Sequence, residues 1–205
     1  MVTIQEIVKN RNRVTVRLDN GEQFWLTQSD VLTHGCYEGQ EFDPETFYQL
    51  IRLCQYPRAL NRAVSMLARR PCSREEIRRK LIFRHYTEEI AELVLFKLEK
   101  EKLVDDVSFC EQWIHYRQQR GYGPSLIRRE LKMKGIPDSV IQECLDRQTD
   151  DDDTNNAVIM ARKARRKLKP SDDEHKNRQK VIQYLVRKGY DWDTARSAAE
   201  AAESE

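Results

Sequence analysis

Two of the pairs of adjacent arginines in this chain lie fifty residues apart, and their type and spacing indicate a particular chemistry. Arg128 and Arg129 follow a glycine-rich stretch that begins at Gly121, and Arg78 and Arg79 occupy the corresponding places earlier in the chain. Guanidinium groups that project together from one helix suit the binding of phosphates or carboxylates. The sequence therefore indicates the recognition of an anionic partner.

The net charge of +2 conceals two strongly basic blocks. Residues 58–84 hold nine Lys or Arg and two Glu, and residues 154–188 hold eleven Lys or Arg and three Asp or Glu. Such blocks suit a polyanion, which could be nucleic acid or an acidic protein groove, whereas any one block alone could be a solvated helix face. The acidic run 150–153 is predicted to be a linker.

Clustered catalytic or metal-binding groups are missing from the sequence. The five cysteines are widely separated without a CxxC pair, and the four histidines have no ligand spacing. Asp105 and Asp106 could bind a metal, but adjacent acids at a helix start more often cap the helix and interact with its dipole. A nuclease or other enzyme would require clustered carboxylates, a histidine or a nucleophile. We therefore expect no enzymatic activity, no metal and no cofactor.

The first 27 residues predict a small antiparallel meander. Val14, Val16 and Leu18 alternate with polar residues before a turn at Asn20 and Gly21, which favours strands at about 2–8, 13–18 and 23–27. The pattern then becomes helical. Ser29 or Asp30 is expected to cap a short helix, and Asp43 to cap a longer one that is interrupted at Tyr56 and Pro57.

Three further helices are predicted between about residues 58 and 103, and they begin an internal repeat. Ser73 with Glu76 forms a capping box for the second helix, and Thr87 caps the third. Adding fifty to a residue number places Ile77 on Ile127, and the other apolar positions follow. Because a core requires only apolar positions to recur, the recurrence of the arginine pair favours a contact role.

The second repeat contains the glycine-rich stretch GYGPSLIRRELKMKGI. Gly121 and Gly123 with the following proline predict a turn, Ile127 and Leu131 predict a buried helix face, and Gly135 predicts a left-handed end. The preceding helix has Phe109, Trp113 and Tyr116 at inward spacing. An offset of fifty-four reveals a third copy, in which Gly189 matches Gly135 but Ile182 and Gln183 replace the arginines.

The segment VDDVSFCEQWIHYRQQRGYGPSLIRRELKMKGI resembles the signature of the RecX regulators of the bacterial recombinase RecA. The resemblance covers about residues 58–190 and is most specific in the middle repeat. It implies a mainly α fold, with tandem three-helix, helix-turn-helix-like repeats in an elongated curved array after the small β meander. It also implies that the array lies in the groove of the RecA filament on single-stranded DNA, restrains ATP hydrolysis and strand exchange, and favours filament loss.

The resemblance and the repeats together define domains and candidate residues. The expected domains are 1–57 (meander and connecting helix), 58–104 (first repeat), 105–149 (second repeat) and 150–205 (acidic linker and degenerate third repeat). The signature residues have structural roles: Asp105, Asp106, Phe109, Trp113, Gly121, Gly123, Ile127, Leu131 and Gly135. The candidate contacts with RecA or DNA are basic: Arg78, Arg79, Arg117, Arg120, Arg128, Arg129, Lys132, Lys134, Arg162, Lys163, Arg165 and Arg166.

The resemblance implies a cytoplasmic, monomeric bacterial protein without a membrane span, acting in DNA repair, homologous recombination and the SOS response. Its partners would be the RecA nucleoprotein filament and, directly or through RecA, single-stranded DNA. Alternatives remain from the residues alone: a helix-turn-helix transcriptional regulator, a nonspecific nucleic-acid-binding protein or a helical adaptor. Against a sequence-specific regulator, the short basic helices lack Asn or Gln residues that would contact base edges.

Overall fold

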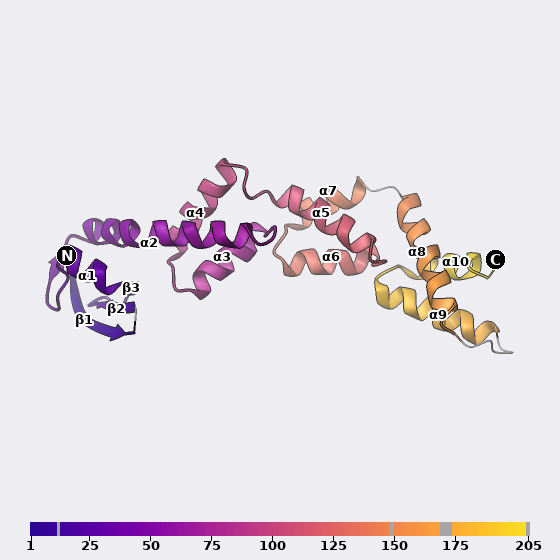
Figure 1. The fold of residues 1–205 in the computed structure, drawn as a ribbon, viewed down its shortest axis with the longest axis horizontal. Coiled ribbons are helices and arrows are strands. Elements are labelled where there is room, and N and C mark those ends of the chain that lie inside the picture. Colours follow the sequence, from indigo (N-terminus) through magenta and orange to yellow (C-terminus); the bar gives the residue numbers. More distant parts are fainter. Residues whose placement is uncertain (12, 148–149, 169–173, 204–205) are drawn as a thin grey trace. The chain divides into compact units, whose positions relative to one another are not determined.

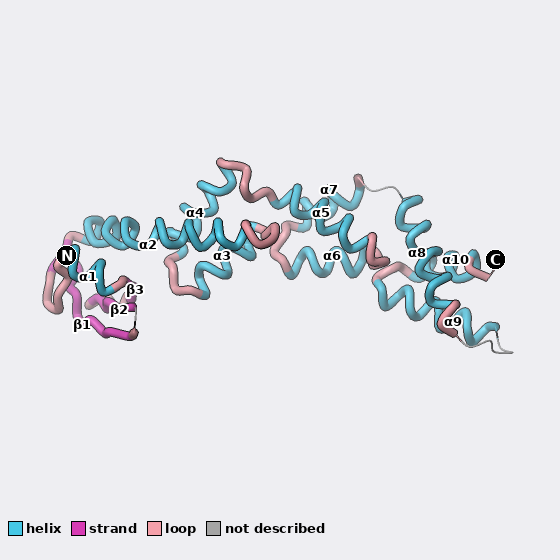
Figure 2. Tube along the Cα trace, in the orientation of Figure 1, coloured by secondary structure: helices cyan, strands magenta, loops and turns pink. Residues whose placement is uncertain are grey.

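The computed structural model describes residues 1–11, 13–147, 150–168 and 174–203. Within these ranges the chain forms ten helices and one four-stranded sheet, and it divides into two compact units, Met1–Val104 and Asp105–Glu205. Figures 1 and 2 show that the strands belong to the first unit. The described part of the chain has no helix with the length and apolarity needed to cross a membrane.

The sheet consists of antiparallel strands in the order β3-β2-β1-β4. The strands β1 (Val2–Asn10), β2 (Arg13–Leu18) and β3 (Gln23–Leu26) confirm the predicted meander. The fourth strand, β4 (Glu41–Phe42), was not predicted, because two residues are too few to show an alternating pattern. Helix α1 (Gln28–His34) lies between β3 and β4 in the sequence. Its N-cap is Thr27, which forms a capping box with Asp30, and not Ser29 or Asp30 as expected.

Helix α2 (Pro44–Leu67) joins the sheet to the first repeat. It is capped by Asp43 as predicted, but the predicted interruption at Pro57 was wrong, because the helix continues through this residue. A proline inside a helix removes one backbone hydrogen bond, and here both flanking turns are fixed by burial. Cys54 before it and Ala59 after it are buried in one core. The domain boundary expected at residue 57 therefore falls inside a helix.

The first repeat is completed by α3 (Arg74–Phe83) and α4 (Glu88–Lys100). The Ser73 capping box and the Thr87 cap are both present, as predicted. This repeat shares its core with the sheet: Trp25 of β3 packs edge-on against Tyr86, with ring centroids 5.1 Å apart. The sheet and the first repeat thus fold as one unit.

The second unit contains two repeats, each with a core of its own. The second repeat comprises α5 (Asp106–Gln118), α6 (Pro124–Met133) and α7 (Asp138–Asp146), and its core contains Ile127 and Leu131 with no exposed surface. Asp105 caps α5 as predicted. Tyr116 does not point inward, since 42% of it is exposed.

The third repeat comprises α8 (Asp150–Arg165), α9 (Glu174–Lys188) and α10 (Trp192–Ala201), with an alanine-rich core. The acidic run 150–153 was predicted as a linker, but it forms the first turn of α8.

Backbone contact between Gly123 and Gly189 joins the second repeat to the third. The amide of Gly123 donates to the carbonyl of Lys188 at 2.9 Å, and the amide of Ser125 donates to that of Gly189 at 3.1 Å. A Cβ atom on Gly123 would lie 2.5 Å from the carbonyl carbon of Gly189. Gly123 has a φ of −87°, so this glycine is required by close packing and not by a left-handed conformation.

Candidate anion-binding interface

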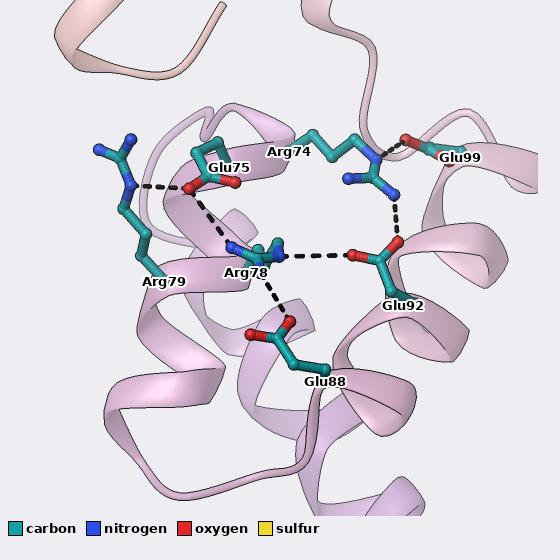
Figure 3. Close-up of polar contacts among 7 residues, drawn as sticks. All are labelled: Arg74, Glu75, Arg78, Arg79, Glu88, Glu92 and Glu99. Atoms are coloured by element: carbon teal, nitrogen blue, oxygen red, sulfur yellow. Dashed lines mark hydrogen bonds and ion pairs between the residues drawn. The ribbon is translucent and has the colours of Figure 1, made fainter.

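The arginines of α3 are held by carboxylates, as Figure 3 shows. Arg78 donates to Glu88 of α4 at 2.7 Å and lies 3.5 Å from Glu92 and 3.6 Å from Glu75. Arg79 pairs with Glu75 at 2.8 Å. The side chain of Arg78 is 32% exposed and that of Arg79 is 56% exposed. The predicted pair is therefore divided, with Arg78 inside an ion-pair network and Arg79 at its edge.

Arg74 extends this network along α4 and shows why it forms. Its Nε atom lies 2.8 Å from Glu99, and its terminal nitrogen also pairs with Glu92. Positions 88, 92 and 99 recur at helical spacing, so one face of α4 presents acids to the basic face of α3. Ion pairs at exposed positions contribute only about 0.2–1 kcal/mol each, so the network adds little to the stability of the fold. Its main effect is that the carboxylates neutralise part of the positive charge on α3.

The arginine pair of α6 is divided differently. Arg128 donates to Gln142 of α7 at 2.5 Å, and Gln142 in turn donates to Asp146. Arg129 is exposed, and its side chain makes no hydrogen bond or ion pair within the described ranges. Lys132 pairs with Asp138 at 2.8 Å. Arg129 is thus the cation of this helix that a partner can approach without displacing an internal contact.

Arg117 lies inside the second repeat and holds α5 against α6. It pairs with Glu130, which also accepts a hydrogen bond from Trp113 Nε1 at 3.1 Å. The two side chains of the ion pair are only 14% and 16% exposed. The Arg117 guanidinium also lies 3.7 Å from the ring centroid of Tyr122. This geometry gives Arg117 a bracing role within the fold.

Two other candidates of the second repeat lie over aromatic rings. Arg120 is exposed and its guanidinium lies 4.2 Å from the Tyr116 ring centroid. Lys134 is half-buried, with Nζ 4.1 Å from the Trp113 ring centroid. A contact of this kind between a cation and a ring face orients the cation.

The basic residues at the end of α8 are also of two kinds. Arg165 pairs with Glu174 at 3.0 Å and with Glu203 at 3.4 Å, and Arg162 is half-buried and has internal partners. Lys163 and Arg166 are exposed, without an ion pair among the residues described. The predicted set therefore separates into cations with internal partners and cations that remain accessible.

Two apolar side chains next to the basic helices were missed in the sequence. Phe83 is 72% exposed and Met133 is 62% exposed, each at the end of the middle helix of its repeat. The offset of fifty places one on the other, so a comparison of outward positions as well as inward ones would have found them. Exposed apolar groups beside cations are typical of protein interfaces.

The buried thiols are unsuited to nucleophilic chemistry. Burial raises the pKa of Cys110 to about 12 and that of Cys54 to about 11, so both remain protonated at neutral pH. All five cysteines are buried, and none of them forms a disulfide bond. The described residues contain no group of three His, Cys, Asp or Glu side chains placed to hold a metal ion.

Family models match each repeat separately. Residues 59–98 match the first three-helix domain of RecX, residues 105–145 the second and residues 150–198 the third. These ranges follow the three helix triplets of the structure, and the division after residue 104 agrees with the boundary between the two compact units.

Whole-chain comparisons give the same family. The chain is 31% identical to a regulatory protein RecX of Clostridium acetobutylicum over 90% of its own length and 87% of that protein. It is 36% identical to the RecX of Prosthecochloris aestuarii over 68% of this chain and 89% of that one. A crystal structure of a regulatory protein RecX matches with a TM-score of 0.65 and 26% identity over the full length of both chains. The chain therefore belongs to the RecX family of regulatory proteins, which are not enzymes.

Proposed function

We propose that this protein binds the filament of RecA on single-stranded DNA and inhibits its ATPase and strand-exchange activities, thereby modulating DNA repair and the SOS response. RecX proteins generally regulate RecA. The observation that supports a direct contact is the state of Arg129, which is exposed and has no ion-pair partner among the described residues. The inner face of the same helix is fully buried. Such a side chain can meet an acidic surface without a cost to the core.

Repetition explains how weak contacts could produce tight binding. A helical filament presents the same surface at regular intervals, and a chain of related three-helix modules can engage successive copies of it. Once one module is bound, the next binds at a raised effective concentration, so affinity grows without any single strong contact. Exposed Phe83 and Met133 would add apolar area at corresponding places of two modules.

The test is RecA ATPase on single-stranded DNA with this protein titrated in, at about 50 and 200 mM salt. Reversal of both charges, Arg128→Glu with Arg129→Glu, is expected to abolish inhibition while leaving the fold intact. Arg129→Glu alone should raise the half-inhibitory concentration at least about tenfold, because it places like charge against the acidic partner. Wild-type inhibition should weaken at the higher salt, since exposed charges are screened.

Lys9→Glu is the matched control, because Lys9 is an exposed cation of β1 without an ion pair in the ranges described. It should leave inhibition within about twofold of wild type, as expected for a charge outside the interface. Undiminished inhibition by folded Arg128→Glu with Arg129→Glu would refute the proposal. Gel retardation with random and genomic duplexes tests the transcriptional alternative, which a strong preference for one duplex would support.

A further inference from the structure

A hollow of about 400 Å³ lies between α8 and α9 in the third repeat. Its floor is apolar and is formed by Met160 and Ala164 of α8, Leu168 in the turn after it, and Val181 of α9. The half-buried ring of Tyr184 forms part of the wall. A hollow with an aromatic wall and an apolar floor can accept a flat ring.

Cations line this hollow, and they have no ion-pair partner in the part of the chain that the structure describes. Four exposed side chains from both helices and the turn line it: Lys163, Lys167, Lys180 and Arg187. Across the described ranges none of them makes an ion pair, and the lining includes no acidic residue. Glu174 and Glu203, two acids of the same repeat, pair instead with Arg165 and Arg178. The local potential is therefore positive around an apolar recess.

We propose that this hollow binds single-stranded DNA directly, with a base stacked on Tyr184 over the apolar floor and the flanking phosphates on the surrounding lysines and Arg187. Proteins that bind single strands combine a positive groove with aromatic rings, because every base has a π face and every nucleotide brings a phosphate. The hollow brings these two elements together within one repeat.

The combination of ring and charge favours a single strand over other anions. A duplex keeps its bases stacked inside and presents phosphates outside, so it would leave the apolar floor and the Tyr184 ring uncovered. An acidic peptide would engage the cations but would need no aromatic wall. The two requirements of the hollow, a flat ring and nearby phosphates, are met together by an unpaired nucleotide.

This inference deepens the proposed function, because it assigns contact with the DNA strand to the third repeat. The two can fail separately. The binding assay below contains no recombinase, so its failure leaves the effect of Arg129→Glu on RecA intact, whereas the ATPase assay can fail while the protein still binds DNA.

The experiment measures fluorescence anisotropy of a labelled oligothymidylate of about 20 nucleotides with the full-length chain. Lys163→Gln with Lys167→Gln should raise Kd at least about tenfold at about 50 mM salt and flatten the dependence of Kd on salt. The matched control is Lys9→Gln with Lys100→Gln, which removes two exposed lysines outside the hollow and should raise Kd less than about threefold.

Substitutions at Tyr184 test the stacking separately. Tyr184→Phe keeps the ring and should bind as wild type does, whereas Tyr184→Leu keeps apolar volume without the ring and should raise Kd at least about fivefold. Thermal melting by circular dichroism identifies any variant that is unfolded. If Tyr184→Leu is unfolded, Tyr184→Phe and the lysine double variant still test the proposal.

Three results would overturn the proposal. Equal losses of affinity in the two lysine double variants would show that binding depends on diffuse positive charge. Undiminished binding by folded Tyr184→Leu would show that no base stacks in the hollow. Oligoglutamate that binds more tightly than oligothymidylate, and loses affinity in the same variants, would make the occupant an acidic peptide.

Discussion

Glu130 stabilises the second repeat through two side chains of the preceding helix. It accepts a hydrogen bond from Trp113 and pairs with Arg117, and both members of the ion pair are largely buried. Glu130→Ala is expected to lower the free energy of unfolding by about 1–3 kcal/mol, because it leaves a buried guanidinium and an indole N–H without their partner. Urea unfolding followed by circular dichroism measures the loss.

Glu75→Ala provides the comparison at ion pairs that are more exposed than the pair of Arg117 with Glu130. Glu75 pairs with Arg78 and Arg79 at the surface of the first repeat, so its loss should change stability by no more than about 1 kcal/mol. If Glu130→Ala is no more destabilising than Glu75→Ala, the bracing role of Arg117 is wrong.

At this scale the sequence predicted residue types better than their availability. It placed Arg78 with Arg79 and Arg128 with Arg129 as equivalent pairs, and the structure gives all four different surroundings. The hydrogen-bond partners Glu88 of Arg78 and Gln142 of Arg128 lie ten and fourteen residues away, on the next helix. Their approach depends on how two helices are rotated against each other, which periodicity alone does not determine.

Single elements were predicted well where a local signal exists. The caps at Ser73, Thr87 and Asp105 depend on residues three or fewer positions apart, and all three are present. The continuity of α2 through Pro57 could not be predicted in this way, because tertiary burial on both sides overrides a local breaker. Gly123 was assigned to a turn, whereas glycine is required there because the backbone of Gly189, 66 residues away, packs against it.

The contact between α6 and α9 gives a prediction for Gly123. Serine is a better N-cap than glycine, and Ser73 fills the equivalent cap of α3. Gly123→Ser should nevertheless destabilise the second unit by about 1–3 kcal/mol, since its Cβ would collide with the Gly189 backbone. Urea unfolding gives the loss, and hydrogen exchange should show faster exchange at the Ser125 amide.

Gly39→Ala is the control for glycine substitution in general. Gly39 has a positive φ of 84°, and no atom lies within 4 Å of the position that a Cβ would take, so alanine there costs about 1–2 kcal/mol through backbone strain in the first unit. It should leave exchange at Ser125 unchanged. A stabilised Gly123→Ser variant would show that capping outweighs the close approach.

At the scale of the whole molecule, the boundary after Val104 separates two folding units. Residues 1–104 contain the sheet, the first repeat and their shared core, so this fragment should fold alone with a cooperative urea transition. A fragment of residues 58–205 should lose the helicity of the first repeat, because it lacks Phe47 and Trp25 from that core. Circular dichroism of both fragments measures this.

A cooperative first repeat in the 58–205 fragment would show that the sheet is an independent appendage. The sequence was divided at residue 57, where Tyr56 and Pro57 were expected to interrupt a helix. Local patterns identify elements and repeats, but a shared core depends on contacts between distant residues, such as Trp25 with Tyr86. The count of repeats was therefore predictable, and the extent of the first folding unit was not.

The approach of Gly123 to Gly189 also limits how this protein can change over generations. A side chain at either position requires the opposing backbone to move. A second substitution at the other glycine would not relieve this clash, because it would add a further side chain to the same contact. Among descendants of this sequence, Gly123 should be kept for as long as this contact is kept, whereas the φ of 96° at Gly189 favours glycine there in any case. Loss of Gly123 would mark lineages in which the second and third modules have separated.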